Sequence, residues 1–282
     1  MTIPEVALSD GPAAVPPRSS KSTLLLLALT IFAVFFSWRS CWYGAPLTDA
    51  EIESYLKGEK GVQEMQRALN KVDERFAAGD AEAKRFLPLV AGLATHENAA
   101  IRKSAAWVLG DAKGARDVAL PVLKTMLADA DILVRGQAAL ALANHGDDSG
   151  RAAIRALLED YRLEAPAAGK LAQSLKAGEP VRSGVRLLRI EPDIGAPVDV
   201  LSPLEGVVKR CEKPLGARLQ KGDVVLVITP GETQTTNALV GLFIVGKKED
   251  AAAVSRVLES NLGLPESVRR RAEETKRVLE TR

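Results

Sequence analysis

The stretch Leu163-Glu-Ala-Pro-Ala-Ala-Gly169 returns later in the chain as Val200-Leu-Ser-Pro-Leu-Glu-Gly206, at an offset of 37 residues. The two copies then continue at an offset of 38 residues, the first with Gly178, Val181, Gly184, Leu187, Leu188 and Ile190, and the second with Gly216, Leu219, Gly222, Val225, Leu226 and Ile228. Proline and glycine mark turns, and the aliphatic residues between them mark short strands. Because a few short strands are barely stable alone, the repeat predicts two matching halves that pack as one small all-β sandwich at residues 161–230.

The glycines of the duplicated unit recur at matching places in the two halves. We expect them to supply the turn conformations that residues with side chains adopt only at a cost; they are Gly169, Gly178, Gly184, Gly206, Gly216 and Gly222.

A second internal repeat, with a period of 33 residues, lies between residues 48 and 160. Ile101-Arg102 with Ala105-Ala106 and Leu109 returns as Val134-Arg135 with Ala138-Ala139 and Leu142, and Leu87-Pro88 returns as Leu120-Pro121. Each unit is read as two helices, with Pro88 or Pro121 in the first turn of the second helix, where a missing amide proton is tolerated. Such pairs must stack to bury their apolar faces, so the pattern predicts an α-solenoid.

Several residues of the helical region receive specific expectations. Trp107 is expected to be buried between units, and Arg102 and Arg135 to tie adjacent units together. His96 and His145 are expected at the surface, since neither has a second ligand at metal spacing. The turn Gly146-Asp-Asp-Ser-Gly150 is expected to cap the next helix, because it lacks the alternating oxygen ligands and closing glutamate of a calcium loop.

The run Ile101-Arg-Lys-Ser-Ala-Ala-Trp-Val-Leu-Gly-Asp111 and its copy at 134–142 resemble HEAT repeats of the short bacterial kind. The resemblance covers about residues 60–160. It implies stacked helix pairs that serve as a binding or scaffolding surface. A related bacterial repeat group includes lyases that attach bilin pigments, but the repeats contain no cysteine for that role.

The residues after Pro230 return to a helical pattern. Amphipathic stripes run from Ala251 to Leu258 and from Val268 to Leu279, the last one starting after Pro265. Val268, Ala272, Thr275 and Leu279 would share one face and pack on the sandwich or on the solenoid. The apolar run 238–245 fits a helix or a strand. Residues 231–282 are therefore predicted to form a C-terminal helical segment.

The N-terminal part of the chain contains an uncharged apolar run from Ser22 to Trp38, with Trp42 and Tyr43 close behind it. This pattern predicts a membrane anchor at residues 22–43, flanked by an aromatic belt at the lipid headgroups. A cleaved signal peptide is the alternative, although bulky Tyr43 disfavours cleavage after Ala45. Basic residues both precede and follow the run, so they do not indicate on which side of the membrane the N-terminus lies. We expect a single-pass protein of the inner (cytoplasmic) membrane with a periplasmic soluble part, preceded by a disordered tail at residues 1–21.

The duplicated unit resembles the biotinyl and lipoyl carrier domain, a barrel-sandwich hybrid that also occurs in membrane fusion proteins, the periplasmic adaptors of efflux and secretion systems. The resemblance rests on Ala165-Pro-Ala-Ala-Gly169 and, in the more typical second copy, on Ser202-Pro-Leu-Glu-Gly206 and Lys221-Gly-Asp223. In a carrier, the joint between the halves presents a lysine that the cofactor acylates. The joint here, residues 190–199, contains no lysine and is too short for the helical hairpin of the adaptors. No covalent cofactor is therefore expected.

Composition and motifs favour a binding protein over an enzyme. The chain has 38 basic and 36 acidic residues, a net charge of +2, and no basic stripe for nucleic acid. No nucleophile pair, phosphate loop, metal set or dinucleotide motif is evident, so no catalytic, cofactor-binding or metal residue is assigned. The expected class is α+β and multi-module. The expected function is a membrane-anchored, non-catalytic scaffold that binds proteins of an envelope transport, secretion or assembly system.

Two alternatives remain open. The first is a carrier or lyase-like protein that uses Lys221 or Cys211 for a covalent cofactor. The second is a true periplasmic adaptor subunit of a transporter.

Overall fold

The computed structural model describes Leu25, Thr30, Ile31, residues 47–259 and residues 264–282. Residues 48–282 form one compact unit, separate from residues 1–47. The predicted disordered tail at 1–21 lies outside the described residues, and so does all of the predicted anchor at 22–43 except three residues. Within the described part of the chain, no helix combines the length and apolarity that a membrane span requires.

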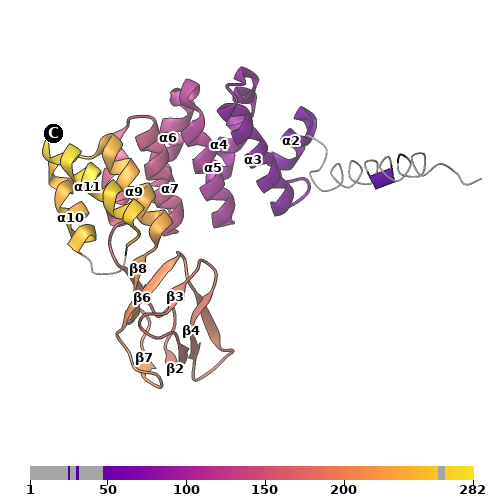
Figure 1. The fold of residues 1–282 in the computed structure, drawn as a ribbon. Helices are drawn as coiled ribbons and strands as arrows, with labels where there is room; N and C mark the ends of the chain where they lie inside the picture. The colour runs from indigo at the N-terminus through magenta and orange to yellow at the C-terminus, as the bar shows by residue number, and fades with distance from the viewer. Residues whose placement is uncertain (1–24, 26–29, 32–46, 260–263) are drawn as a thin grey trace, which may run out of the picture. The chain divides into compact units, whose positions relative to one another are not determined.

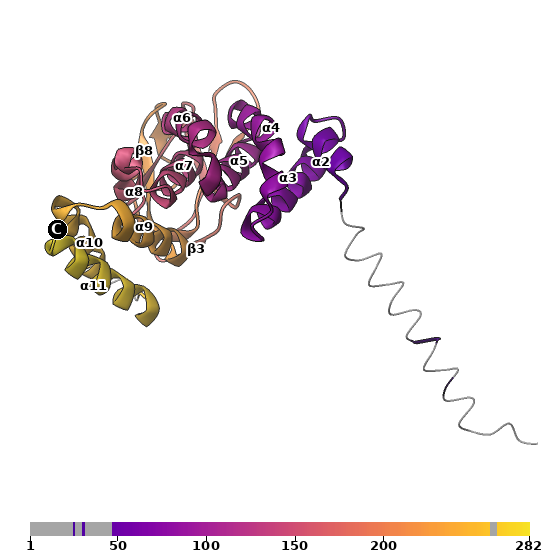
Figure 2. The same ribbon diagram turned by 90° about the horizontal axis from the view of Figure 1, so that it is seen from above.

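Helices occupy the first part of the compact unit. The helices of this region are α2 (Asp49–Leu56), α3 (Val62–Ala77), α4 (Leu87–Gly92), α5 (Ala99–Asp111), α6 (Arg116–Met126), α7 (Ile132–Asn144) and α8 (Arg151–Ala156). Helix α5 packs between α3 and α7, and Figures 1 and 2 show these helices side by side in chain order. The predicted helical repeat region is confirmed.

The 33-residue repeat is visible in the caps and in the helix contacts. Asn98 caps α5 by accepting the amide of Ala100 at 2.9 Å, and Asp131 caps α7 by accepting the amide of Leu133 at 2.7 Å. Gly110 lets α5 approach α7 closely, because a Cβ there would lie 2.8 Å from the Cβ of Ala141.

Arg102 ties adjacent units together as predicted. Its guanidinium donates from Nε to Asp129 Oδ2 at 2.6 Å and from Nη2 to Oδ1 at 2.9 Å. This two-point geometry fixes the planar guanidinium. Arg135 instead donates to the carbonyl of Asp129 at 2.6 Å, in the loop before its own helix. The prediction was therefore right for Arg102 and wrong for Arg135.

Three other expectations were wrong. Trp107 is 51% exposed, because it lies on the side of α5 opposite the buried positions Ile101, Ala105 and Leu109. His145 is only 4% exposed, and its Nε2 lies 2.8 Å from the carbonyl oxygen of Leu109 in the preceding unit. Pro121 lies in the middle of α6, which starts at Arg116, rather than in its first turn.

The turn at Gly146–Gly150 caps the next helical segment, as predicted. Asp147 accepts hydrogen bonds from the backbone and the hydroxyl of Ser149 and lies 2.8 Å from Lys124 Nζ. Burial raises the pKa of the Asp147 carboxyl, but the bonds from Lys124 and Ser149 outweigh it and lower the pKa to about 2.

This depressed pKa predicts how the protein responds to acid. A carboxyl with a folded-state pKa below its ordinary value stabilises the fold above that value, and the contribution is lost as pH falls toward the folded pKa. Asp147→Asn keeps a capping oxygen but does not titrate. We expect its free energy of unfolding to fall about 2 kcal/mol less than that of the wild type between about pH 4 and about pH 2, as measured by urea unfolding. If the free energy of unfolding of both proteins fell equally over this pH range, Asp147 would not have this role.

The middle of the chain forms eight strands. They are β1 (Tyr161–Glu164), β2 (Gly169–Ser174), β3 (Pro180–Val181), β4 (Arg186–Glu191), β5 (Val198–Leu201), β6 (Gly206–Cys211), β7 (Arg218–Leu219) and β8 (Val224–Pro230). They build two four-stranded antiparallel sheets, with the orders β1-β8-β6-β3 and β5-β4-β2-β7. Buried aliphatic residues of both sheets share one core.

The two halves of the duplication fill equivalent places in these sheets. Exchanging each strand of the first half for its counterpart in the second half converts one strand order into the other. Strands β2 and β6 begin 37 residues apart and β3 and β7 begin 38 residues apart, so the extra residue lies in the turn after β6. This arrangement agrees with the sandwich of two matching halves that the sequence predicts.

The glycines serve two different purposes. Those at the turns have the positive φ that the prediction required, with values of 79–89° at Gly178, Gly184, Gly216 and Gly222. Gly206 does not have a positive φ, so the turn prediction was wrong there. It begins β6 at a close approach of two strands, where a Cβ would overlap the carbonyl oxygen of Thr229.

The α-helices described after the strands, in residues 231–259 and 264–282, are α9 (Glu232–Val245), α10 (Ala251–Glu259) and α11 (Glu266–Glu280). The run 238–245 is therefore helical. Val268, Ala272, Thr275 and Leu279 are all buried on one face of α11, as predicted. That face packs mainly on α9 and α10.

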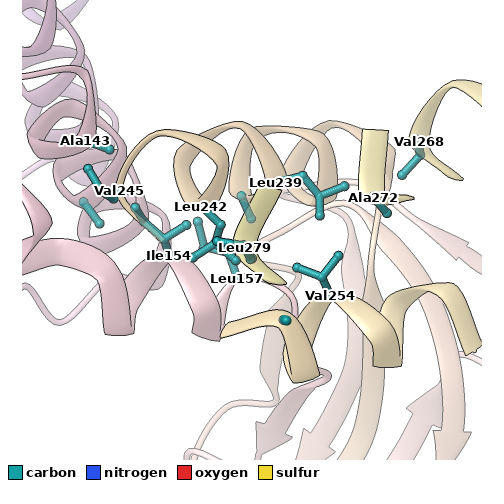
Figure 3. Packing of buried hydrophobic residues seen from close by; sticks show 13 residues of the cluster. Ala143, Ile154, Leu157, Leu239, Leu242, Val245, Val254, Val268, Ala272 and Leu279 are labelled. Atoms are coloured by element: carbon teal, nitrogen blue, oxygen red, sulfur yellow. The ribbon is translucent and has the colours of Figure 1, made fainter. Parts of the chain in front are cut away.

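The C-terminal helices complete the core of the solenoid. Helix α9 packs on α7 and α8, and Figure 3 shows residues such as Ile154 and Leu157 meeting Leu239, Leu242 and Leu279 in one apolar cluster. The strands are thus inserted between α8 and α9. Because β1 and β8 are paired neighbours, the inserted module begins and ends at the same place.

Candidate functional site

Two adjoining cavities lie along the exposed face of α3, α5, α7 and α9. The first has a volume of about 210 Å³ and the second about 360 Å³, and they share Lys103, Trp107 and Gln137. We call them together the Trp107 groove. Besides the shared residues, it is lined by Asn70, Asp73, Ser104 and Val108 in the first cavity, and by Leu133, Gly136, Leu140, Leu157, Ser183, Leu204, Glu205, Thr233, Gln234 and Asn237 in the second.

The indole of Trp107 lies where the two cavities meet. Its Nε1 donates to Asp73 Oδ2 at 3.0 Å, which links α5 to α3. Half of the residue remains exposed. A large aromatic side chain held in place at a cavity mouth offers contact area at little cost in conformational entropy, and tryptophan is among the residues that most often dominate protein interfaces.

The second oxygen of Asp73 is buried without a donor. Asp73 Oδ1 is the one buried side-chain oxygen or nitrogen atom without a hydrogen-bond partner in the described part of the chain. Burial raises the pKa of Asp73, the hydrogen bond from Trp107 lowers it, and Asp111 raises it through its charge and through a hydrogen bond between the two carboxyl groups. The Asp73 carboxylate is therefore held in surroundings that disfavour its charge.

The second cavity is mainly aliphatic and lies between helices and strands. Leu133 and Leu140 of α7 line it with Leu157, after α8, and Leu204, before β6. Gly136 permits this close packing, because a Cβ there would lie 2.7 Å from Leu157 Cδ2. On the α9 side of the cavity, the side chain of Gln234 donates to the carbonyl of Leu157 at 3.0 Å and so ties α9 to the residue that follows α8. The groove thus combines an aliphatic floor with one polar, acidic end.

The joint between the two halves of the β module is the hairpin that connects β4 and β5. It contains no lysine, so no amide to a carrier cofactor can form there. Ile194 is 93% exposed at its tip, and Asp193 pairs with Arg218 beside it.

Neither residue that the sequence offered for covalent chemistry lines the groove. Cys211 ends β6, is exposed, and its Sγ lies 3.3 Å from the carbonyl oxygen of Leu175. Lys221 is exposed in the turn between β7 and β8. In the residues that the structure describes, no three His, Cys, Asp or Glu side chains gather as metal ligands would.

From the sequence, Trp107 was expected to have a structural role and Asp73 no role, and the groove was not predicted. One signal was present, since Trp107 falls off the stripe formed by Ile101, Ala105 and Leu109, which marks the buried face of α5.

Comparison with known proteins gives one family match. A family model of HEAT repeats matches residues 67–143 and 86–172. No curated protein matches the chain. A solved structure, described as a single-chain, multi-domain long-chain acyl-CoA carboxylase, is 20% identical over 48% of this chain and 14% of that chain, with a TM-score of 0.25. This chain thus spans a small part of that protein, and the likeness is too weak to carry an argument. The helical region contains HEAT repeats.

Proposed function

We propose that the protein is a non-catalytic scaffold that binds a protein partner in the Trp107 groove. The observation that carries the proposal is the half-exposed indole of Trp107, fixed by Asp73 at the junction of an aliphatic and a polar cavity. HEAT repeats, which are found here, are associated with protein–protein interaction. A large anchored aromatic residue beside a groove is the arrangement expected of an interface hot spot.

The β module contributes one wall of this binding surface. Ser183, Leu204 and Glu205 come from its turns and line the second cavity together with α7 and α9. We propose that the module is a lipoyl-like barrel-sandwich hybrid that carries no cofactor. Its duplicated strand order supports the first part of this proposal, and the lysine-free joint supports the second.

The proposed scaffold works beside a membrane. The support comes from sequence alone, namely the uncharged apolar run from Ser22 to Trp38 with its aromatic flank. With this anchor in the inner membrane and the compact unit in the periplasm, the partner would be a component of an envelope transport, secretion or assembly complex.

Site-specific crosslinking tests the groove as the binding surface. A photo-crosslinking amino acid at Asn237, which lines the groove, is expected to capture a discrete partner in intact cells, whereas the same group at exposed Asp117 of α6 does not. Trp107→Ala is expected to lower the Asn237 crosslink about 30-fold, since removing a hot-spot tryptophan costs about 2 kcal/mol or more.

A matched control keeps this result interpretable. Trp107→Phe preserves the aromatic surface but loses the bond to Asp73, so it is expected to retain part of the crosslink, and circular dichroism should show all variants folded. Equal crosslinking from Asn237 and Asp117, or a yield unaffected by Trp107→Ala, would refute the groove as the binding surface.

A further inference from the structure

The polar end of the Trp107 groove has a charge environment that an added cation would relieve. The carboxylate of Asp73 is partly buried, its Oδ1 has no donor among the ordinary hydrogen-bond donors of the described residues, and the negative charges of Asp111 and Glu74 act on it. A buried acceptor without a donor costs free energy, and two close carboxylates repel each other. Both effects raise the free energy of the protein at Asp73 when no partner is bound.

The indole of Trp107 lies against the same carboxylate. Its Nε1 donates a hydrogen bond to one oxygen of Asp73. The ring lies beside the first cavity, and about half of the Trp107 residue is exposed to solvent. The face of a tryptophan ring attracts a guanidinium or an ammonium group. The half-exposed Trp107 and the carboxylate of Asp73 line the same cavity, and both attract a cationic group.

The size of the first cavity fits one long side chain. Its volume of about 210 Å³ is lined by Asn70, Asp73, Ser104 and Gln137, which together supply acceptors for several N–H donors. Lys103 also lines this cavity, and its exposed ammonium is on a flexible chain that can turn to solvent.

We propose that the Trp107 groove recognises a partner segment through a basic side chain, with arginine preferred, that stacks on Trp107 and donates to Asp73. Apolar residues flanking this arginine occupy the second cavity, against Leu140, Leu157 and Leu204. Arginine is preferred because its planar group can stack and donate two hydrogen bonds at the same time. This inference rests on the proposed protein-binding function and names the chemistry of the partner.

The test uses the full chain in detergent with Trp38 and Trp42 replaced by phenylalanine. Trp107 is then the only tryptophan, since the chain has three. The probes are N-acetyl-arginine amide and its neutral isostere N-acetyl-citrulline amide, and the signal is Trp107 fluorescence. We expect saturable quenching by the arginine probe with a Kd on the order of 1 mM, and at least about tenfold weaker binding of the citrulline probe.

Two variants of α3 assign the effect to one carboxylate. Asp73→Asn keeps an acceptor for the Trp107 indole but removes the charge, so binding of the arginine probe is expected to fall at least about tenfold, with Tm unchanged or higher. Glu74→Gln makes the same charge change at an exposed neighbour paired with Lys71, and is expected to bind like the wild type.

Each possible result is decisive. Equal quenching by the two probes, retained binding in Asp73→Asn, or equal losses in Asp73→Asn and Glu74→Gln would overturn the proposal. If the Asn237 crosslink depends on Trp107 but is insensitive to Asp73→Asn, the scaffold function stands and the cation pocket fails. If the arginine probe binds as expected but the crosslink ignores Trp107, the pocket exists and the proposed binding surface fails.

Discussion

Replacing Gly206 by alanine is expected to unfold or severely loosen the β module. The added Cβ would overlap the carbonyl oxygen of Thr229, which belongs to the neighbouring strand β8 and cannot move without breaking the β6–β8 ladder. Overpacking at a rigid contact costs about 1–3 kcal/mol and occasionally more. Because backbone atoms of two paired strands would collide here, we expect Gly206→Ala to lower the free energy of unfolding by about 3 kcal/mol. Denaturant unfolding, with hydrogen exchange of the β8 amides, measures the loss.

Gly184 is the matched control for this experiment. It has a φ of 79°, but nothing lies within 4 Å of a Cβ built there. Alanine at Gly184 therefore adds only the strain of a left-handed backbone, about 1–2 kcal/mol. Equal losses for Gly206→Ala and Gly184→Ala would show that the strands can separate easily, and would contradict the close-packed geometry described above.

Asp250→Ala is expected to destabilise the packing of the C-terminal helices on the solenoid. The Asp250 carboxylate is fully buried and lies 3.1 Å from Nη1 of Arg151 and 3.4 Å from Nη1 of Arg155, both on α8. It also accepts the backbone amide of Lys247 at 2.9 Å. Removing one partner of a buried ion pair costs about 3–5 kcal/mol, and the lower end applies because both arginines reach solvent.

Glu249→Gln provides the comparison. Glu249 is an exposed neighbour that pairs with the same Arg151 at 2.6 Å, and surface pairs contribute at most about 1 kcal/mol. Urea unfolding followed by circular dichroism should therefore rank the Asp250 variant well below the Glu249 variant. If the two variants were equally stable, the buried carboxylate would not be what ties the segment before α10 to the arginines of α8.

The features that were predictable from sequence depend on local periodicity. The 33-residue repeat places Asn98 and Asp131 at equivalent caps, and the duplicated glycines place equivalent turns, so both modules follow from spacing alone. The amphipathic stripe at Val268, Ala272 and Leu279 likewise defines the buried face of α11. Each of these patterns can be recognised from the spacing of residue types along the chain, without knowledge of which distant segments touch.

The features that were missed depend on contacts between distant segments. His145 is buried because the preceding unit presents the Leu109 carbonyl to its Nε2, and no local pattern reports that carbonyl. The second cavity needs α7, α9 and the turn at Leu204 to meet, which is a tertiary arrangement. Trp107 differs from these cases, because its exposure follows from its position off the buried stripe of α5, although large aromatic side chains are usually buried.

The insertion of the β module between α8 and α9 couples the stability of the helical core to that of the strands. The apolar cluster around Leu157 and Leu242 can close only when residues on either side of the inserted strands come together. The paired strands β1 and β8 bring those ends to one place, so a folded module replaces a long, flexible loop closure with a short one. A folded β module therefore lowers the entropic cost of closing the helical core around Leu157 and Leu242.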